Sequence, residues 1–439
     1  MWPRERAMTA LAYAFLDGDW SNEGLIRRAA LVAGNSRPPL RKLVRRLLRA
    51  YPRPPWDRVR ELTAWLLAID LKQDDPDWTP FFSPTRWLTY QPAMGEMRWP
   101  VPAIPTLGEL SHFFGLSSSE LEWFADVRSL ERRVSDEPLR HYRYRWVDKK
   151  RGGARLIEAP KQRLREIQRH LLRTILDRIP PHECAHGFVR GRSAVTFALG
   201  HTSSDIVLRL DLENFFGSIN AGRVYRVFRT AGYPESVAHS LTGLTTNAMP
   251  LAVWRGAPVA VREDFMFGKR LEQPHLPQGA PTSPAVANLC AHGLDRRLAG
   301  LALSFGVGYS RYADDLALSG ALGPSSVARL IVLATEIAHD EGFNIRPAKT
   351  LVMGKGHRQR IAGIVVNEKP NLDRPSYERL RAALHNASVR GIDAANVGGR
   401  DRFGEHLTGR VAWAVSLNPA RARKLRPLLA KALETPPDA

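Results

Sequence analysis

Residues 309–318 read Tyr-Ser-Arg-Tyr-Ala-Asp-Asp-Leu-Ala-Leu, so two adjacent acids, Asp314 and Asp315, stand between apolar segments. Adjacent carboxylates are costly in a protein interior, because like charges repel strongly where the dielectric constant is low. A divalent cation removes this cost, and Mg²⁺ prefers hard oxygen ligands. A bare Asp-Asp pair usually only caps a turn. A pair in a hairpin between two apolar strands, with Tyr312 two residues before it, is more specific and predicts a metal site.

A second acidic segment, residues 207–216, reads Val-Leu-Arg-Leu-Asp-Leu-Glu-Asn-Phe-Phe. Here an apolar strand ends at Asp211, and an aromatic pair follows. Asp211 precedes Asp314 by 103 residues (314 − 211), so only the fold brings these acids together. Two metal ions at such a site activate a 3′-hydroxyl and stabilise a leaving pyrophosphate. We therefore expect Asp211, Asp314 and Asp315 to form a catalytic site.

Residues 312–315 resemble the YxDD box of reverse transcriptases, in its bacterial form. Further blocks follow in that family's order from about Tyr142 to Asn367, and chance agreement of so many ordered blocks is negligible. These blocks are Lys149-Lys150 with Gly152-Gly153 and Arg155, residues 185–188 with 191–193, residues 276–284, residues 342–344 with Lys349, and residues 361–367. Within the family the chain is most similar to retron-type enzymes. It differs from them at Phe197 and Ala362, where they typically have Asn and Thr.

The resemblance implies a set of metal ligands. Asp211, Asp314 and Asp315 are the expected ligands of two Mg²⁺ ions, with Mn²⁺ as a substitute, and the alternative for Asp315 is a role mainly through its charge. The Leu212 carbonyl is implied as a further ligand. Lys349 is implied either as the acid for the leaving pyrophosphate or only as a charge near it.

The family's sugar gate is an aromatic residue that excludes a 2′-hydroxyl, and the resemblance places it at Phe216, five residues after Asp211. The alternative is an aromatic residue of the core. Because neighbours on a strand point to opposite faces, we favour Phe216 over Phe215 as the gate.

The remaining substrate contacts are expected from two other blocks. Gln278 and Gly279 are predicted to open a helix whose backbone amides meet a phosphate or the template, with a surface turn as the alternative. Arg155, Lys149 and Lys150 are predicted to bind the triphosphate, and the two lysines alternatively contact only the template backbone.

The composition indicates a nucleic-acid partner. The 439 residues include 64 Lys and Arg against 44 Asp and Glu, a formal charge of +20, which attracts polyanions. The two cysteines, Cys184 and Cys290, are too few for a zinc site or a disulfide framework, so we expect reduced thiols in a cytoplasmic protein. The apolar stretch 7–16 is too short to span a membrane, and we expect an amphipathic helix and no membrane association.

The order of elements predicts an α+β fold, which the resemblance makes a right-hand polymerase. Its parts are fingers, a palm with a small antiparallel sheet, and a helical thumb, preceded by an N-terminal helical extension. We expect residues 1–105 to form that extension with a Pro- and Trp-rich connector. Residues 106–140 are expected to be a small helical element, 141–369 the fingers and palm, and 370–439 the basic thumb.

Local patterns predict several individual elements. Thr106 with Glu109 forms a capping-box signal. Strands are expected at 142–147, 154–157, 206–212 and 316–319, and one long helix at 161–179. The thumb's packing face is expected to consist of Phe403, Leu407, Val411 and Trp413.

The expected activity is RNA-directed DNA synthesis that adds deoxynucleoside triphosphates to a 3′-hydroxyl. The retron resemblance implies a structured non-coding RNA that is both template and primer, an RNA–DNA duplex as product, and a role in anti-phage defence, with an effector protein as a further partner. The alternatives are another defence-associated or group-II-like reverse transcriptase with different priming, and a non-catalytic nucleic-acid-binding scaffold. An RNA polymerase is opposed by the aromatic residue at Phe216.

Overall fold

A computed structural model describes residues 4–33, 38–52, 54–55, 59–69, 92–134, 136–149 and 153–434. The chain forms two compact units, which are Met1–Ile179 with Ala221–Pro274, and Pro180–Asn220 with His275–Ala439. The segment 141–369, predicted as fingers and palm, therefore contributes residues to both units.

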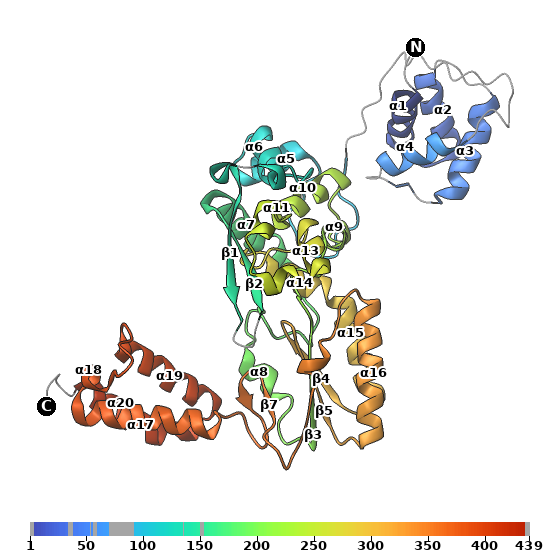
Figure 1. Ribbon diagram of the computed structural model, residues 1–439. Coiled ribbons are helices and arrows are strands. Elements are labelled where there is room, and N and C mark those ends of the chain that lie inside the picture. Colours follow the sequence, from blue (N-terminus) through green and yellow to red (C-terminus); the bar gives the residue numbers. More distant parts are fainter. Residues whose placement is uncertain are drawn as a thin grey trace. The chain divides into compact units, whose positions relative to one another are not determined.

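The first unit begins with four helices that share one buried apolar cluster, in which Leu11, Phe15 and Leu43 are almost completely shielded from solvent. On the second and third helices apolar residues recur every three or four positions, as a helix with one packed face requires, whereas the first helix is buried over most of its residues. The predicted helical character of this region is confirmed over its described part (Figure 1). The helices are α1 (Arg4–Leu16), α2 (Asn22–Ala33), α3 (Pro38–Ala50) and α4 (Val59–Ala68).

The first unit continues with capped helices and a hairpin. Thr106 and Glu109 form the predicted capping box, and Ser117 with Glu120 forms a second one that was not predicted. The predicted strands near 142 and 154 pair as an antiparallel hairpin. The elements are α5 (Leu107–Phe114), α6 (Ser118–Ala125), β1 (Tyr142–Asp148), β2 (Ala154–Pro160), α7 (Gln162–Thr174), α9 (Ala221–Thr230), α10 (Glu235–Thr245), α11 (Leu251–Arg255), α12 (Val259–Arg262) and α13 (Phe265–Glu272).

The single helix predicted at 161–179 is wrong beyond Thr174. Helix α7 ends at Thr174, and a separate 3₁₀ turn follows at Leu176–Arg178. The β-branched residues Thr174 and Ile175 disfavour further helix, and Pro180 stops it.

The second unit contains the predicted small antiparallel sheet, with strand order β4-β5-β3-β6. A nearly continuous apolar run, interrupted by Arg209, buries the inner strand β3 on both faces of the sheet, where Val207, Leu208 and Leu210 are fully buried. Helix α15 packs against β4 and α16 (Figure 1). The elements are α8 (Ala194–Leu199), β3 (Ile206–Asp211), α14 (Ser283–Cys290), α15 (His292–Ser304), β4 (Gly308–Tyr312), β5 (Asp315–Gly320), α16 (Pro324–Asp340), β6 (Leu351–Gly354), β7 (Arg360–Ile361) and β8 (Ile364–Val365).

The C-terminal helices have a buried apolar cluster of their own, to which Leu407 and Val411 belong as predicted. Trp413 was predicted on the same face, but 37% of its surface is exposed. The packed positions follow one another at intervals of three or four residues, so Ala414, not Trp413, continues the face. The helices are α17 (Arg374–Arg390), α18 (Ile392–Ala395), α19 (Phe403–Leu417) and α20 (Ala422–Glu434).

No helix within the described ranges is long and apolar enough to cross a membrane. Both cysteines are free thiols and partly exposed.

Candidate active site

Strand register brings the three predicted acids together. Asp211, the last residue of β3, lies directly opposite Asp315, the first residue of β5. The Leu212 N–H donates a hydrogen bond of 2.8 Å to the Asp314 carbonyl oxygen, which fixes the β4–β5 turn against the end of β3. Ala313 in this turn has a φ of +56°, a conformation that few residues with a side chain adopt.

Two of the three acids have a cationic partner. Lys349 Nζ donates to both carboxylate oxygens of Asp211, at 2.8 Å each. Arg209 donates from Nε and Nη2 to Asp315 Oδ1, at 2.9 and 2.6 Å. Arg209 pairs with Ala317 in the β3–β5 register, so it is a diagonal neighbour of Asp315 on one face of the sheet.

Asp314 differs from the other two acids, because it forms no ion pair with any residue that the structure describes. Burial raises the pKa of its carboxyl group, and the nearby charges of Asp315 and Asp211 raise it further. Burial also raises the pKa of Asp315, although Arg209 opposes that shift. The site therefore carries a negative charge that its own cations do not balance.

The donor chemistry of the site fits a hard divalent cation, since it offers several carboxylate oxygens and excess negative charge. Across the described ranges, however, no three histidine, cysteine or acidic side chains are already arranged as a metal-binding set. Asp211 and Asp315 instead form ion pairs with Lys349 and Arg209.

The aromatic pair after Asp211 is split between core and surface. Phe215 is 5% exposed and stacks on Phe343 with ring centroids 5.7 Å apart. Phe216 is partly exposed, and its ring lies 6.3 Å from that of Phe188. The predicted difference between the two rings is present, but strand alternation is the wrong reason for it. Both residues lie in a turn, because β3 ends at Asp211.

Phe188 was not predicted as a site residue. Its side chain is 55% exposed and its φ is +60°, both unusual for a large apolar residue. Its ring lies 6.4 Å from Tyr312 as well as 6.3 Å from Phe216, so it connects the acidic turn with the predicted sugar gate. Phe188 belongs to one of the sequence blocks that resemble the family, but neither its exposure nor its backbone conformation can be predicted from the sequence.

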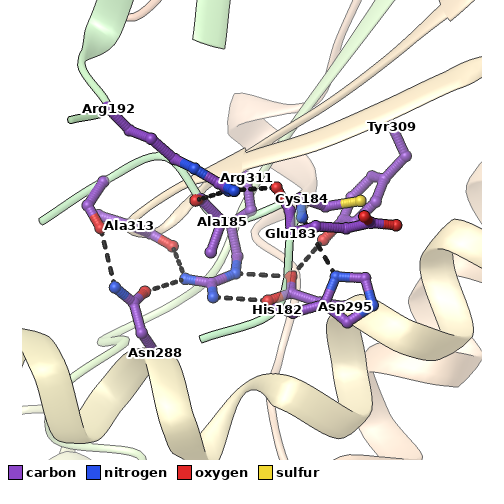
Figure 2. A network of polar contacts seen from close by, with 11 residues as sticks. His182, Glu183, Cys184, Ala185, Arg192, Asn288, Asp295, Tyr309, Arg311 and Ala313 are labelled. Atoms are coloured by element: carbon purple, nitrogen blue, oxygen red, sulfur yellow. Dashed lines mark hydrogen bonds and ion pairs between the residues drawn. The ribbon is translucent and has the colours of Figure 1, made fainter. Parts of the chain in front are cut away.

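A buried arginine holds the acidic turn in place (Figure 2). Arg311, the residue before Tyr312, is completely buried, and its Nε and Nη2 donate to the two oxygens of Asp295 at 2.8 and 2.7 Å. Its Nη1 donates to Asn288 Oδ1 at 2.9 Å and to the Ala313 carbonyl at 3.2 Å. One side chain thus connects strand β4, helices α14 and α15, and the turn that carries Asp314.

The backbone of Arg311 holds the loop that contains Phe188. Its N–H donates to the Cys184 carbonyl at 2.8 Å, and its carbonyl accepts from the His186 N–H at 2.7 Å. Asn288 Nδ2 also donates to the Gly187 carbonyl at 2.8 Å. A Cβ atom at Gly187 would lie 2.6 Å from the Ala313 nitrogen, so only glycine permits this approach to the turn.

The Gln278-Gly279 block is a turn, and the prediction that it opens a helix is wrong. Helix α14 begins only at Ser283. Gly279 has a non-helical φ of +138°, and Pro281 disfavours helical backbone at the residue before it. The Ser283 hydroxyl closes the turn by donating to the Pro277 carbonyl at 2.7 Å.

The predicted triphosphate contacts belong to the other compact unit. Arg155 is exposed on β2, and the Lys149 N–H closes the hairpin by donating to the Gly153 carbonyl at 2.8 Å. Lys150 lies outside the described residues.

Comparison with known proteins identifies the family. Residues 147–366 match the family described as "Reverse transcriptase (RNA-dependent DNA polymerase)". The chain belongs to this family. It is 37% identical over 329 residues to the Retron Mx65 reverse transcriptase of Myxococcus xanthus, a match that covers 75% of this chain and 72% of that protein.

Two further relatives carry similar names. The Retron Mx162 reverse transcriptase of Myxococcus xanthus is 37% identical, over 72% of this chain and 64% of that protein. The Retron Ec86 reverse transcriptase of Escherichia coli is 31% identical, over 68% of this chain and 86% of that protein. The retron-type assignment is thereby confirmed, and this reverse transcriptase is an RNA-directed DNA polymerase. Its family generally uses divalent metal ions, in agreement with the acidic end of β3 and β5.

Proposed function

We propose that this reverse transcriptase binds two Mg²⁺ ions, replaceable by Mn²⁺, through Asp211, Asp314, Asp315 and the Leu212 carbonyl. Bound there, the ions would activate the 3′-hydroxyl and stabilise the leaving pyrophosphate. The observation that carries this proposal is Asp314, a half-buried carboxylate beside two others that forms no ion pair with any residue of the described chain. Lys349 and Arg209 would hold Asp211 and Asp315 in position by their ion pairs.

Several other side chains would then act on the substrates. Lys349 would protonate the departing pyrophosphate, to which its ammonium group is suited as a general acid. Phe216 would exclude a 2′-hydroxyl. The turn at Gln278 and Gly279 would contact the template and the incoming nucleotide. The hairpin residues Arg155, Lys149 and Lys150 would bind the triphosphate with charged donors.

In this proposal the sheet β4-β5-β3-β6 is the palm, the β1–β2 hairpin belongs to the fingers, and helices α17 to α20 are the thumb. Basic residues of the thumb would follow the phosphate backbone of the RNA–DNA duplex. The four N-terminal helices form an extension of the polymerase. We place the enzyme in the cytoplasm, with an effector protein as a further partner.

We further propose that the enzyme makes single-stranded DNA linked to a cognate non-coding RNA, which serves as template and primer, and that it functions in anti-phage defence. The support is the identity to reverse transcriptases named for retrons, over most of this chain. The formal charge of +20 agrees with an RNA partner but does not select one RNA, since it strengthens binding to all of them.

The test is to isolate the protein from its native host and sequence the nucleic acid bound to it. We expect one abundant structured RNA, encoded beside the protein's gene, with covalently attached DNA. In an Asp211→Asn variant the DNA should be lost while the RNA remains, because the carboxylate serves chemistry and not RNA binding. Heterogeneous RNA, or DNA without an RNA link, would favour another defence-associated or group-II-like enzyme. DNA that persists in the variant would favour a non-catalytic scaffold that binds DNA made elsewhere.

A further inference from the structure

Helix α3 of the N-terminal bundle separates apolar from charged residues almost completely. Leu40, Leu43, Val44 and Leu47 are at most 1% exposed and face the bundle core. The opposite side exposes five cations, and the exposed Ala50 ends the helix. We call this side the α3 basic face, and its exposed residues are Arg41, Lys42, Arg45, Arg46 and Arg49.

The α3 basic face differs from the rest of its bundle. Each of the other three helices has an acid in its first turn, namely Glu5, Glu23 and Glu61, as the helix dipole favours. Helix α3 has no acid in its first turn or anywhere along its length. Its charge pattern is therefore a property of this helix and not of the bundle.

This pattern costs stability within the isolated helix. Arg41, Arg45 and Arg49 follow one another at four-residue intervals, so each is a surface neighbour of the next. Each such like-charge pair destabilises a helix by roughly 0.2–0.5 kcal/mol. These three arginines form no ion pair with a residue that the structure describes, so nothing there offsets their repulsion. A local arrangement that costs stability in this way often serves function. An anionic partner would reverse the sign of every one of these interactions.

The type of these side chains indicates the chemical class of the partner. Four of the five cations are arginine, whose planar guanidinium binds phosphate oxygens with two parallel hydrogen bonds. Residues four apart on a helix rise by about 6 Å, so the three arginines present a straight row of phosphate donors. The same chain uses RNA as its template, and RNA is a polyanion with a phosphodiester backbone.

We propose that the α3 basic face is a second nucleic-acid-binding surface, which binds the phosphodiester backbone of the RNA partner without reading its bases. It would add affinity for RNA to that of the polymerase and leave the chemistry of nucleotide addition unchanged.

The test uses the full-length protein and a labelled RNA hairpin, titrated at several NaCl concentrations. The triple variant Arg41→Gln, Arg45→Gln, Arg49→Gln should bind more weakly, and the slope of log K against log [NaCl] should fall by about 2 to 3, roughly one per lost phosphate contact. Extension of a short primer–template at saturating concentration should not change. The melting temperature should stay equal or rise, because three like charges no longer repel one another.

A matched control removes the same number of charges elsewhere in the bundle, from the exposed residues Arg6, Arg27 and Arg60 by the same change to glutamine. This control should keep the wild-type slope, and the charge-conserving change of the three α3 arginines to lysine should keep most of it. Equal slopes for the α3 and control variants would overturn the proposal. So would an unchanged slope for RNA together with α3-dependent binding to phosphatidylserine vesicles, which would assign the surface to a membrane instead.

Discussion

Phe215 and Phe216 are adjacent in sequence, yet one is held in the core by Phe343 and the other borders the acidic turn. The two rings have the same chemistry, so only their surroundings in the fold distinguish their roles. Phe215 also lies 5.6 Å from the Arg311 guanidinium, as part of the packing behind the turn. Substitution of each ring therefore distinguishes a structural residue from a selective one.

We predict that Phe216→Ala raises incorporation of ribonucleotides relative to deoxynucleotides, because it opens space beside the 2′ position. The loss of discrimination should be about 10- to 200-fold, as expected for removing one steric contact at a small group. Competing single-nucleotide incorporation assays measure it. Phe215→Ala is the matched control, which should destabilise the protein by about 3–5 kcal/mol and leave discrimination unchanged. Loss of discrimination in the Phe215 variant instead would assign the gate to that ring.

A second prediction concerns Gly187. In Gly187→Ala the added methyl group would press on the Ala313 nitrogen and displace the turn that carries Asp314. Because a shift of about 1 Å in reacting groups costs on the order of 100-fold in rate, kcat should fall by about that factor. Gly356→Ala is the control, since nothing lies within 4 Å of the added atom there. Wild-type turnover in the Gly187 variant would show that this close approach is dispensable.

At the level of single residues, the three acids were predictable because they follow apolar strands in a recognisable order. Their ion pairs were not, although the family resemblance had already implied Lys349 as a site residue. Lys349 is 138 residues from Asp211, and Arg209 is 106 residues from Asp315. Arg209 follows from the β3–β5 register once that register is known, since it lies diagonally across from Asp315. The position of Lys349 beside Asp211 can be predicted only from the tertiary fold of the second unit.

Between elements, the ion pair of Arg311 and Asp295 connects strand β4 with helix α15 behind the acidic turn. Both side chains are fully buried, and the Tyr309 hydroxyl also donates to Asp295, at 2.8 Å. Burial of either charge alone is strongly unfavourable, so the pair is stable only when both partners are present.

We predict that Asp295→Leu destabilises the protein by about 3–5 kcal/mol, because it leaves Arg311 buried without its counter-charge. The double variant Arg311→Met, Asp295→Leu should recover a large part of that loss in urea denaturation, since no buried charge remains. Its kcat should nevertheless stay low, because the contacts to Asn288 and the Ala313 carbonyl are absent. Wild-type kcat in the double variant would contradict a positioning role for Arg311.

Element boundaries were predictable where a local signal determines them. The capping box at Thr106 and Glu109 specified a helix start without tertiary information. The end of α7 was not predicted, because the β-branched residues near Ile175 disfavour helix where the overall pattern favours it. The exposure of Trp413 was not predicted, because it depends on the exact spacing of the packed helical face. The division into two compact units could not be predicted either, because the chain passes between them three times.

For the molecule as a whole, stability depends on pH through buried histidines. His201 is 1% exposed, with Nδ1 2.8 Å from Ser319 Oγ and Nε2 2.6 Å from Ser310 Oγ. Burial lowers its pKa to about 4 in the folded protein, against 6.5 ordinarily. Between these values the unfolded chain binds a proton that the folded chain does not, so stability is full above pH 6.5 and declines as pH falls towards 4.

The decline attributable to His201 should approach about 3 kcal/mol at pH 4, from a shift of roughly 2.5 units at 1.36 kcal/mol each. Urea denaturation at pH 7 and pH 4.5 measures it. His201→Gln should be less stable than wild type at pH 7 but lose less on acidification. An equal loss in both proteins would assign the pH dependence to other histidines, such as His186, whose pKa burial also lowers.

The most direct test of the whole account is primer extension on an RNA template with deoxynucleotides and Mg²⁺, comparing wild type with Asp314→Asn. This change keeps the shape of the side chain and removes the carboxylate of the site that forms no ion pair with a residue that the structure describes. Loss of about 4 kcal/mol of transition-state stabilisation predicts extension slower by roughly a thousandfold. The melting temperature should be equal or higher, because repulsion from Asp211 and Asp315 is removed. The exposed residue Glu368 provides the control, as Glu368→Gln should extend normally. Extension by folded Asp314→Asn at the wild-type rate would contradict the assignment of this site as the centre of DNA synthesis.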